Sequence, residues 1–258
     1  MIKVAVVNQK GGVGKTTTVV NLSTAIALED LRVLVVDGDA QANASSGFGI
    51  NRRNAKNLYH LLIGKATIED VLIKVENAKL DLLPSSPDLI GVDTELRGKP
   101  NWELTLKNIL ESISQNYDYI FIDAPPSLGT LTILILSSAE YVLIPVQAEY
   151  YALEGVAQLL ETVHYVRRTI NPKLKLLGFL ITMYDKRTKL SEQVEEEIRR
   201  IFKEMVFQTI IPRSIRLAEA PSYGIPGVIF DPLSVGAIAY KNLAKEIINR
   251  FARREVRV

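Results

Sequence analysis

The chain has 258 residues and a formal net charge of +2; 47% of its residues are hydrophobic and 23% are charged. This composition is typical of a soluble globular protein that is long enough to bury a core without covalent cross-links. Cysteine is absent, which excludes disulfides, cysteine nucleophiles, thiolate zinc sites and iron–sulfur clusters. No signal-peptide core and no apolar stretch of bilayer length is found, so we expect a cytoplasmic protein.

Short apolar runs rich in β-branched residues alternate with segments of helical period. In chain order, strands are predicted at residues 2–7, 32–37, 80–83, 119–123, 141–146, 176–182 and 206–211. Helices are predicted at residues 15–28, 101–115, 153–170, 191–204 and 236–251, with small helices within residues 51–79. The predicted strands do not alternate strictly between polar and apolar residues, which is typical of parallel strands buried on both faces. The pattern predicts a single α/β domain over residues 1–258, with a doubly wound, mostly parallel sheet and helices on both faces.

A glycine-rich loop between the first strand and the first helix carries the strongest chemical signal. Its glycines let backbone N–H groups approach an anion, and the helix after it presents the positive end of its dipole. Lys15 can reach the β- and γ-phosphates of a nucleotide, and the Thr16 hydroxyl is placed for Mg²⁺. A strand before the loop and a helix after it are the context of a P-loop NTPase. The predicted nucleotide contacts in this loop are Gly11, Gly12, Val13, Gly14, Lys15, Thr16 and Thr17.

Two further predicted strands end in aspartate, which places carboxylates at the sheet edge where ligands of α/β proteins bind. Asp37 and Asp39 follow the second strand, and Asp123 closes the apolar run 119–122. That run has the form of a Walker B strand, whose aspartate holds Mg²⁺ or its waters. We therefore predict a metal site formed by Thr16, Asp37 and Asp123. Carboxylates after strands also cap turns, which is the alternative for Asp37 and Asp39.

The segment Lys10-Gly-Gly-Val-Gly-Lys15-Thr16 departs from the standard P-loop, which has glycine at the position of Gln9. It resembles the deviant Walker A motif of the ParA/MinD family of ATPases. The resemblance implies ATP and Mg²⁺ as cofactors, and a homodimer in which Lys10 reaches across to the partner's phosphates. It also matches Asp39 to the residue that positions the attacking water. Lys10, Lys15 and Asp39 are therefore the predicted catalytic residues, and Lys10 is a further nucleotide contact.

Two other loops extend the resemblance. Residues 37–43 are similar to the family's first switch loop, with Ala40 and Ala42 in place of the usual Pro and Gly. Residues 211–224 resemble the I-P-R-N-x-R-L-x-E-A-P-S signature of the chromosomal partition branch, with Ser214 in place of Asn. Relatives bind the adenine base at this strand end, which makes Pro212 and Arg213 candidate base contacts.

Cations cluster in two places in the second half of the chain. Lys186, Arg187 and Lys189 fall within four residues after a predicted strand, and Arg216 lies in the partition-branch signature. Clustered cations are sufficient for phosphate binding without base reading. By resemblance, Arg187 and Arg216 match arginines that contact DNA in relatives. These four residues are the predicted DNA contacts, with a solvated charged loop as the alternative.

The resemblance implies a ParA-type partition ATPase that dimerises with ATP and binds DNA without sequence preference, which predicts nucleoid association. It also implies a ParB-type centromere-binding partner that stimulates hydrolysis. The alternative is a MinD-like membrane-cycling ATPase, because residues 241–258 could form a basic amphipathic helix. We expect Leu243, Ile247 and Phe251 to pack on the sheet instead, without membrane binding. A metabolic ligase of the same superfamily is a third reading, for which no substrate constellation is found.

Overall fold

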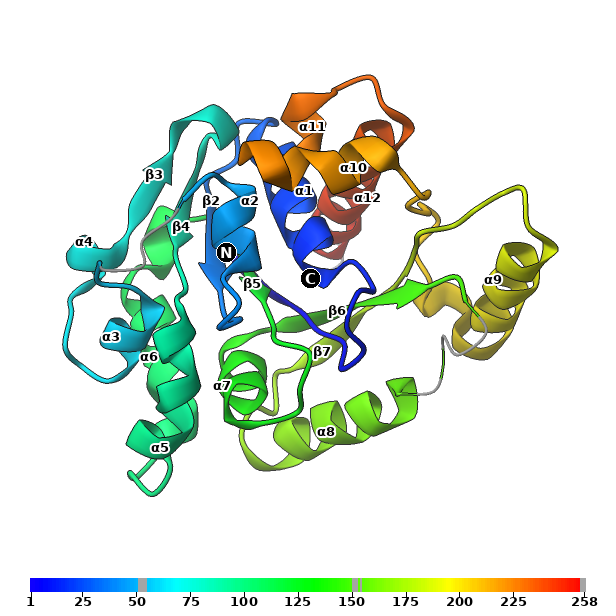
Figure 1. Cartoon of the computed structure of the whole chain (residues 1–258). Coiled ribbons are helices and arrows are strands. Elements are labelled where there is room, and N and C mark those ends of the chain that lie inside the picture. Colours follow the sequence, from blue (N-terminus) through cyan, green and yellow to red (C-terminus); the bar gives the residue numbers. More distant parts are fainter. Residues whose placement is uncertain (51–54, 150–152, 154, 256–258) are drawn as a thin grey trace.

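A seven-stranded sheet in the order β3-β4-β2-β5-β1-β6-β7 runs through the molecule (Figure 1). The computed structural model describes the chain except residues 51–54, 150–152, 154 and 256–258. The strands are β1 Ile2–Val6, β2 Val33–Asp37, β3 Ile73–Val75, β4 Leu80–Leu83, β5 Tyr119–Asp123, β6 Tyr141–Gln147 and β7 Lys175–Thr182. Each pairing is parallel except that of β3 with β4. The predicted mostly parallel α/β sheet is confirmed.

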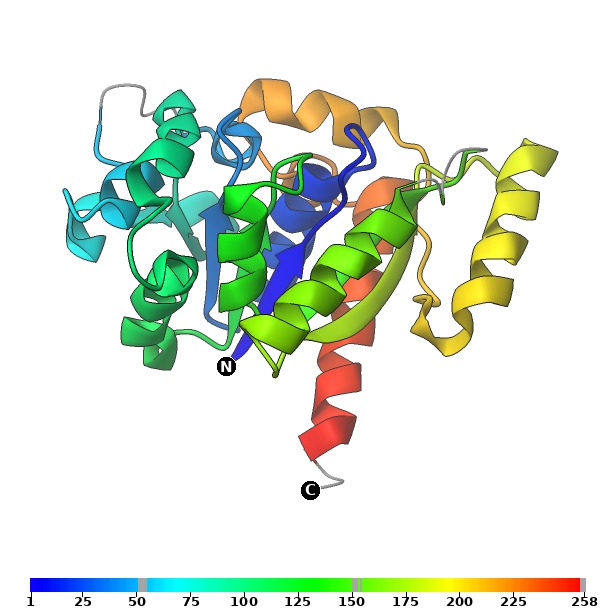
Figure 2. The same cartoon turned by 90° about the horizontal axis from the view of Figure 1, so that it is seen from below.

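Helices cover both faces of the sheet. Successive strand residues point to opposite sides, so the strands contribute apolar side chains to two cores. In β1, Val4 and Val6 join a core with α1 and α12, whereas Ala5 joins a second core with α6, α7 and α8 (Figures 1 and 2). The helices are α1 Lys15–Ala27, α2 Asn43–Gly47, α3 Leu58–Leu62, α4 Ile68–Val71, α5 Val92–Leu96, α6 Thr105–Ser112, α7 Thr130–Ser138, α8 Val156–Thr169, α9 Lys189–Phe202, α10 Ile215–Glu219, α11 Gly227–Phe230 and α12 Val235–Glu255.

The parallel register gathers the carboxyl ends of β2, β5 and β1 at one edge of the sheet. Asp37 at the end of β2 is the direct register partner of Asp123 at the end of β5. Val6 at the end of β1 is the partner of Asp123 on its other side. The loop from β1 to α1 therefore emerges beside both carboxylates, although these residues are far apart in sequence.

The predicted strand at 206–211 is wrong. This segment lies beside β7, and its Phe207 and Ile211 N–H groups each donate to β7 at 2.9 Å. It is bridged only at isolated points, by Val206 with Phe179 and, just past the segment, by Pro212 with Tyr184. The reason is a competing acceptor: the backbone N–H groups of Gln208 and Thr209 donate to the Glu246 carboxylate of α12, at 3.0 and 2.9 Å. A continuous ladder with β7 is thereby interrupted.

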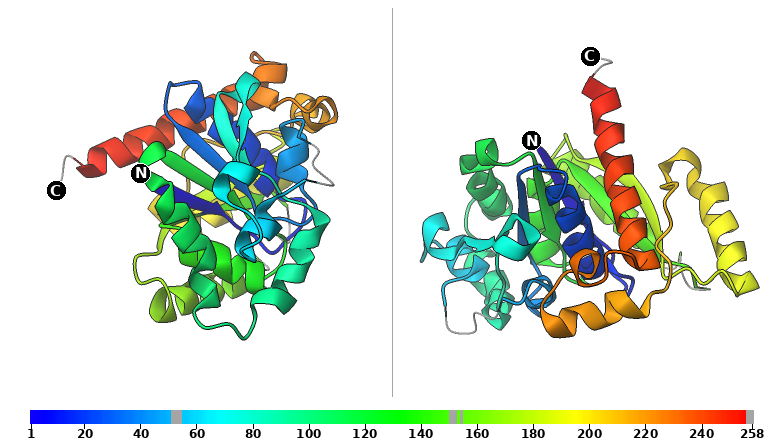
Figure 3. Two further views of the ribbon diagram at one scale, coloured as in Figure 1. Left: turned by 90° about the vertical axis from the view of Figure 1, so that its left-hand side faces the viewer. Right: turned by 90° about the horizontal axis from the view of Figure 1, so that it is seen from above.

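Other boundaries also differ from prediction. Residues 73–75, expected within small helices, form the antiparallel edge strand β3. The predicted helix at 101–115 is divided into short turns around α6. Helix α9 begins at Lys189, two residues before the predicted start, because Thr188 caps it: the Thr188 side chain accepts from the Ser191 N–H. Figure 3 shows α9 at the outer end of the molecule, beyond β7.

The C-terminal helix α12 packs as expected from its apolar stripe. Leu243 and Ile247 are fully buried and Phe251 is 6% exposed. The Phe251 ring packs edge-on against Tyr141 of β6, with centroids 4.9 Å apart. The apolar side of this helix is thus used inside the protein. In the part of the chain that the structure describes, none of the helices has the combined length and hydropathy of a membrane span.

Burial predicts that the same substitution lowers the free energy of unfolding by different amounts at two leucines, one within α12 and one just before it. Leu243 is 0% exposed, whereas Leu233, just before α12, is 85% exposed. Leu243→Ala should lower the free energy of unfolding by about 2–5 kcal/mol, because it removes a packed side chain and leaves a cavity. Leu233→Ala should stay within about 0.5 kcal/mol of the parent. Urea denaturation measures both, and equal costs would contradict the packing of α12.

Candidate nucleotide site

The loop between β1 and α1 has the backbone form that its glycines allow. Gly12 and Gly14 have φ of 75° and 87°, in the left-handed region that glycine adopts without strain. A Cβ on Gly11 or Gly12 would meet nothing within 4 Å, so open space lies over this part of the loop. Gly14 is the residue before α1, whose first N–H groups have no partners within the helix. The loop can therefore receive an anion.

Lys15 lies at the start of α1 with its ammonium among polar groups. Its side chain is buried, and Nζ donates to the Lys10 carbonyl oxygen at 3.1 Å. Burial lowers the pKa of Lys15, while the nearby Asp123 and Asp39 carboxylates act in the opposite direction. A charge held in this poorly solvated place interacts more strongly with a phosphate than a surface lysine does.

Asp123 is fully buried at the end of β5, and only one of its two carboxylate oxygens has a hydrogen-bond partner. Oδ2 accepts a hydrogen bond from Thr16 Oγ1 at 2.7 Å, whereas Oδ1 has no partner. Burial, and next the charge of Asp37, raise the pKa of Asp123 well above its usual value. A carboxylate oxygen without a partner beside a hydroxyl is the kind of ligand set that Mg²⁺ takes, completed by water and phosphate oxygens. The residues present therefore fit this cation.

Asp37 is held by the segment that follows it. Its Oδ2 accepts from both the N–H and the hydroxyl of Ser45, each at 2.7 Å, and Oδ1 accepts from the Asp39 N–H at 3.3 Å. Burial raises the pKa of Asp37 to about 6. Its metal-binding role stays a prediction, because both oxygens are occupied by hydrogen bonds. In the described residues, no three His, Asp or Glu side chains converge as a metal site.

Asp39 lies in the same cluster, 7% exposed, with Oδ1 accepting from the Gln41 N–H at 3.0 Å. Its charge acts on Lys15 and Asp123, so it lies near the expected position of the terminal phosphate. Ala42, which replaces the usual glycine, has a φ of 54°. This left-handed conformation is strained for alanine and explains why glycine is usual here.

Lys10 pairs with Glu149 rather than with the aspartates of the cluster. Its Nζ lies 3.8 Å from Glu149 Oε2, and its side chain is 39% exposed. Its backbone N–H donates to Asn8 Oδ1 at 3.0 Å, which fixes the loop and leaves the side chain free to move. Glu149 was not predicted as a site residue, because it lies in no recognisable motif.

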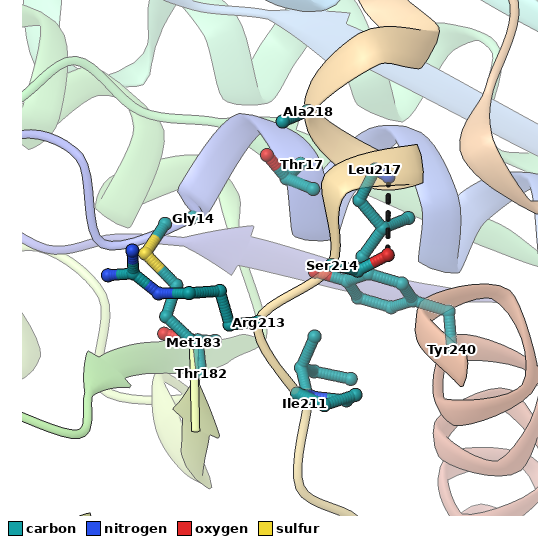
Figure 4. Close-up of a pocket in the computed structure, with 11 residues that line it drawn as sticks. Gly14, Thr17, Thr182, Met183, Ile211, Arg213, Ser214, Leu217, Ala218 and Tyr240 are labelled. Atoms are coloured by element: carbon teal, nitrogen blue, oxygen red, sulfur yellow. Dashed lines mark hydrogen bonds between the residues drawn. The ribbon is translucent and has the colours of Figure 1, made fainter. Parts of the chain in front are cut away.

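A cavity of about 240 Å³ opens beside Gly14 at the ends of β7 and the following segment (Figure 4). Pro212 and Arg213 line it, as their assignment as base contacts requires. Ser214 caps α10 through its hydroxyl, which accepts from the Leu217 N–H at 3.4 Å. Seven of the eleven lining residues were not predicted as contacts: Thr182, Met183, Tyr240, Ile211, Ser214, Leu217 and Ala218. The first two follow from the end of the predicted strand at 176–182, whereas Tyr240 had no signal.

The predicted DNA contacts do not form one cluster. Lys186 and Arg187 line a surface groove of about 950 Å³ together with Arg213. Lys189, in the first turn of α9, and Arg216, on α10, are not part of this groove. The Arg187 guanidinium pairs with Asp185 at 2.7 Å, and that of Arg216 pairs with Glu219 at 3.0 Å.

Comparison with known proteins gives consistent matches over the chain. A family described as an AAA domain matches residues 1–176. The sporulation initiation inhibitor protein Soj of Bacillus subtilis is 48% identical over 245 residues, covering 95% of this chain and 97% of that protein. The chromosome-partitioning ATPase Soj of Thermus thermophilus is 50% identical over 248 residues, covering 96% of each.

A solved structure supports the fold assignment. Cobyrinic acid a,c-diamide synthase from Mycobacterium smegmatis, with bound ADP and magnesium, superimposes with a TM-score of 0.87 at 34% identity. The match covers 98% of this chain and 96% of that one. With the relatives and the deviant P-loop taken together, the chain belongs to the ParA/MinD family of P-loop ATPases, in its Soj-like chromosomal partition branch.

Proposed function

We propose that this protein is a ParA-type partition ATPase that binds and hydrolyses ATP with Mg²⁺. The observation that carries the proposal is the buried Asp123 carboxylate, paired on one oxygen with Thr16 and unpartnered on the other, beside the P-loop. The relatives named for chromosome partitioning, and the neighbour solved with ADP and magnesium, support it.

Each part of the site has a task in nucleotide binding. The loop at residues 11–14 presents N–H groups to the phosphates, and Lys15 neutralises their charge from a poorly solvated position. The cavity lined by Pro212 and Arg213 takes the base. Thr16 and Asp123 would hold Mg²⁺, which supplies positive charge to the β- and γ-phosphates. Asp37 fixes the loop that carries Asp39 through its bonds to Ser45 and the Asp39 N–H.

Hydrolysis requires a water held in line with the terminal phosphate. Asp39 is nearly buried and not hydrogen-bonded to Thr16, so it can orient this water without taking the metal position. Lys10 is exposed and paired only loosely with Glu149, which leaves it free to enter a partner's site in a face-to-face dimer. Its charge would then act where negative charge develops in the transition state.

The ATP-bound dimer is proposed to bind DNA through cations on its surface. Lys186, Arg187 and Arg213 around one groove, with Arg216 on α10, offer cations to phosphates. Binding of this type has no sequence preference and would place the protein on the nucleoid. A ParB-type partner would release it by stimulating hydrolysis.

The membrane-cycling alternative is less well supported. Leu243, Ile247 and Phe251, which a membrane-bound helix would expose, lie in the core. The ligase alternative has one observation in its favour, the name of the Mycobacterium smegmatis structure at 34% identity. Relatives at 48% and 50% identity have names that point to sporulation control and chromosome partitioning, and we propose partition on that ground.

Two substitutions separate the steps of the proposed cycle. Asp39→Ala should bind ATP and dimerise but lose about 100-fold or more in turnover, because it removes positioning rather than binding. Lys10→Ala should bind ATP as a monomer and fail to dimerise. Analytical ultracentrifugation with ATP, together with phosphate release, measures both steps. Lys65→Ala, at an exposed lysine elsewhere, is the matched control. Wild-type turnover in Lys10→Ala would refute the sandwich dimer.

A binding experiment distinguishes DNA from membrane as the target. The protein should bind duplex DNA with a slowly hydrolysed ATP analogue but not with ADP, and should not sediment with anionic liposomes. Arg187→Glu should weaken binding to every duplex alike and flatten its salt dependence. Arg32→Glu is the control, because Arg32 forms a similar pair with Asp118 at the opposite edge of the sheet. Nucleotide-dependent liposome binding without DNA binding would favour the membrane alternative.

A further inference from the structure

The arginines predicted to bind DNA already hold carboxylates of the same chain. Arg187 donates from Nε to Asp185 Oδ1 at 2.9 Å and from Nη2 to Oδ2 at 2.7 Å. Arg216 lies between Glu219 and Asp231, at 3.0 and 3.3 Å. By contrast, within the described residues Lys186 and Lys189 form no ion pair. Of these four predicted DNA contacts, the two arginines, whose guanidinium donors are planar and forked, are therefore the ones that are occupied.

The Arg187 pair has the geometry of phosphate recognition. A guanidinium binds a carboxylate and a phosphate through the same two parallel N–H groups, so the two anions compete for it. The Arg187 side chain is 81% exposed, and exposed ion pairs contribute little to stability. A role in holding the fold together therefore does not account for this contact.

Asp185 is held in place independently of the Arg187 side chain. Its Oδ1 accepts from the Arg187 backbone N–H at 3.0 Å, and its own N–H donates to Ser191 Oγ at 3.3 Å. Its carbonyl accepts from the Thr188 hydroxyl at 3.0 Å, within the turn that begins α9. Because the carboxylate is only two residues from Arg187, its local concentration at the guanidinium is high, and any phosphate must displace it.

We propose that Asp185 is an intramolecular competitor of DNA phosphate, which occupies the guanidinium fork of Arg187 and keeps DNA binding weak and readily reversible. This inference rests on the proposed DNA-binding function. The hydrogen bonds from Arg187 hold the pKa of Asp185 well below its usual range, so the carboxylate stays charged and competes across the physiological pH range. Arg216 is occupied differently, by single contacts of Nη1 with Glu219 and of Nε with Asp231.

Neutralising Asp185 gives a specific expectation. Asp185→Asn keeps an oxygen that accepts from the Arg187 N–H, so the turn before α9 is preserved while the charge is removed. DNA affinity with a slowly hydrolysed ATP analogue should rise about two- to fivefold for each Arg187 released. The plot of log affinity against log salt should steepen by about 0.9 for each added phosphate contact. Fluorescence anisotropy of a labelled duplex at several salt concentrations measures both.

Two controls give the test its specificity. Asp118→Asn adds the same charge and frees Arg32 from a similar two-pronged pair, but at the amino ends of β2 and β5. Its DNA affinity should stay within twofold of the parent. In an Arg187→Ala background, Asp185→Asn should lose most of its gain, because only the weaker interaction of Asp185 with Arg213 is then left. Thermal unfolding verifies that each variant is folded.

The outcomes separate this inference from the function on which it rests. Tighter, more salt-dependent binding by Asp185→Asn, largely lost without Arg187 and absent in Asp118→Asn, supports the proposal. Unchanged or weaker binding by Asp185→Asn overturns it, and so does an equal gain in Asp118→Asn, which would reflect net charge alone. If the parent protein with the ATP analogue does not bind DNA at all, the proposed function itself fails.

Discussion

The carboxylates of Asp37 and Asp123 are fully buried on neighbouring parallel strands, in direct register with each other. Burial and, for Asp123, repulsion from Asp37 raise the pKa values of both groups, that of Asp37 to about 6. Because the folded-state pKa of Asp37 lies above the unfolded value, the stability it contributes is present at low pH and is lost as the pH rises through 6. Near neutral pH this pair of carboxylates therefore favours the binding of a cation.

The loops around this pair of carboxylates supply hydrogen-bond donors and a positive charge. Thr16 donates a hydroxyl hydrogen bond to Asp123 and Ser45 donates one to Asp37. Lys15 brings a buried ammonium near Asp123 and Asp39. The Ser45 hydroxyl also accepts from the Ser85 N–H at 3.1 Å, which ties the loop after β2 to the loop after β4. On the other side, Thr182 of β7 donates to the Val13 carbonyl at 2.8 Å. The P-loop is thus joined to β7, where the cavity proposed for the base begins.

The same separation of tasks extends to the surface. The charged groups expected to serve the nucleotide, Lys15, Asp37 and Asp123, are buried. The cations proposed to serve DNA or a second subunit lie at the surface, and some of them pair with a nearby acidic side chain. Lys10 with Glu149 and Arg187 with Asp185 are of this second kind. Exposed pairs exchange partners at little cost, so binding steps can be reversed in each round of hydrolysis.

Much of the fold could be predicted, because β-branched runs and helical periodicity are visible within short stretches of sequence. The P-loop and Asp123 were evident for the same reason: a strand, a loop and a helix adjoin in sequence. Features set by distant contacts were not predictable. The segment at 206–211 reads as a strand, but Glu246 of α12 takes its N–H groups. Helix α7 was missed because it is apolar all round and has no stripe, and the place of Tyr240 beside the cavity depends on how α12 packs.

The dependence of ATP binding on Mg²⁺ tests the central role of the buried carboxylates most directly. Isothermal titration calorimetry with a slowly hydrolysed ATP analogue, in Mg²⁺ and in EDTA, compares the parent protein with Asp123→Asn. We expect Mg²⁺ to tighten binding about tenfold or more in the parent. Asp123→Asn, which keeps the volume and the hydrogen bond from Thr16, should bind in EDTA at least as well as the parent and gain less than about twofold from Mg²⁺. A variant that kept the full Mg²⁺ dependence would contradict this account.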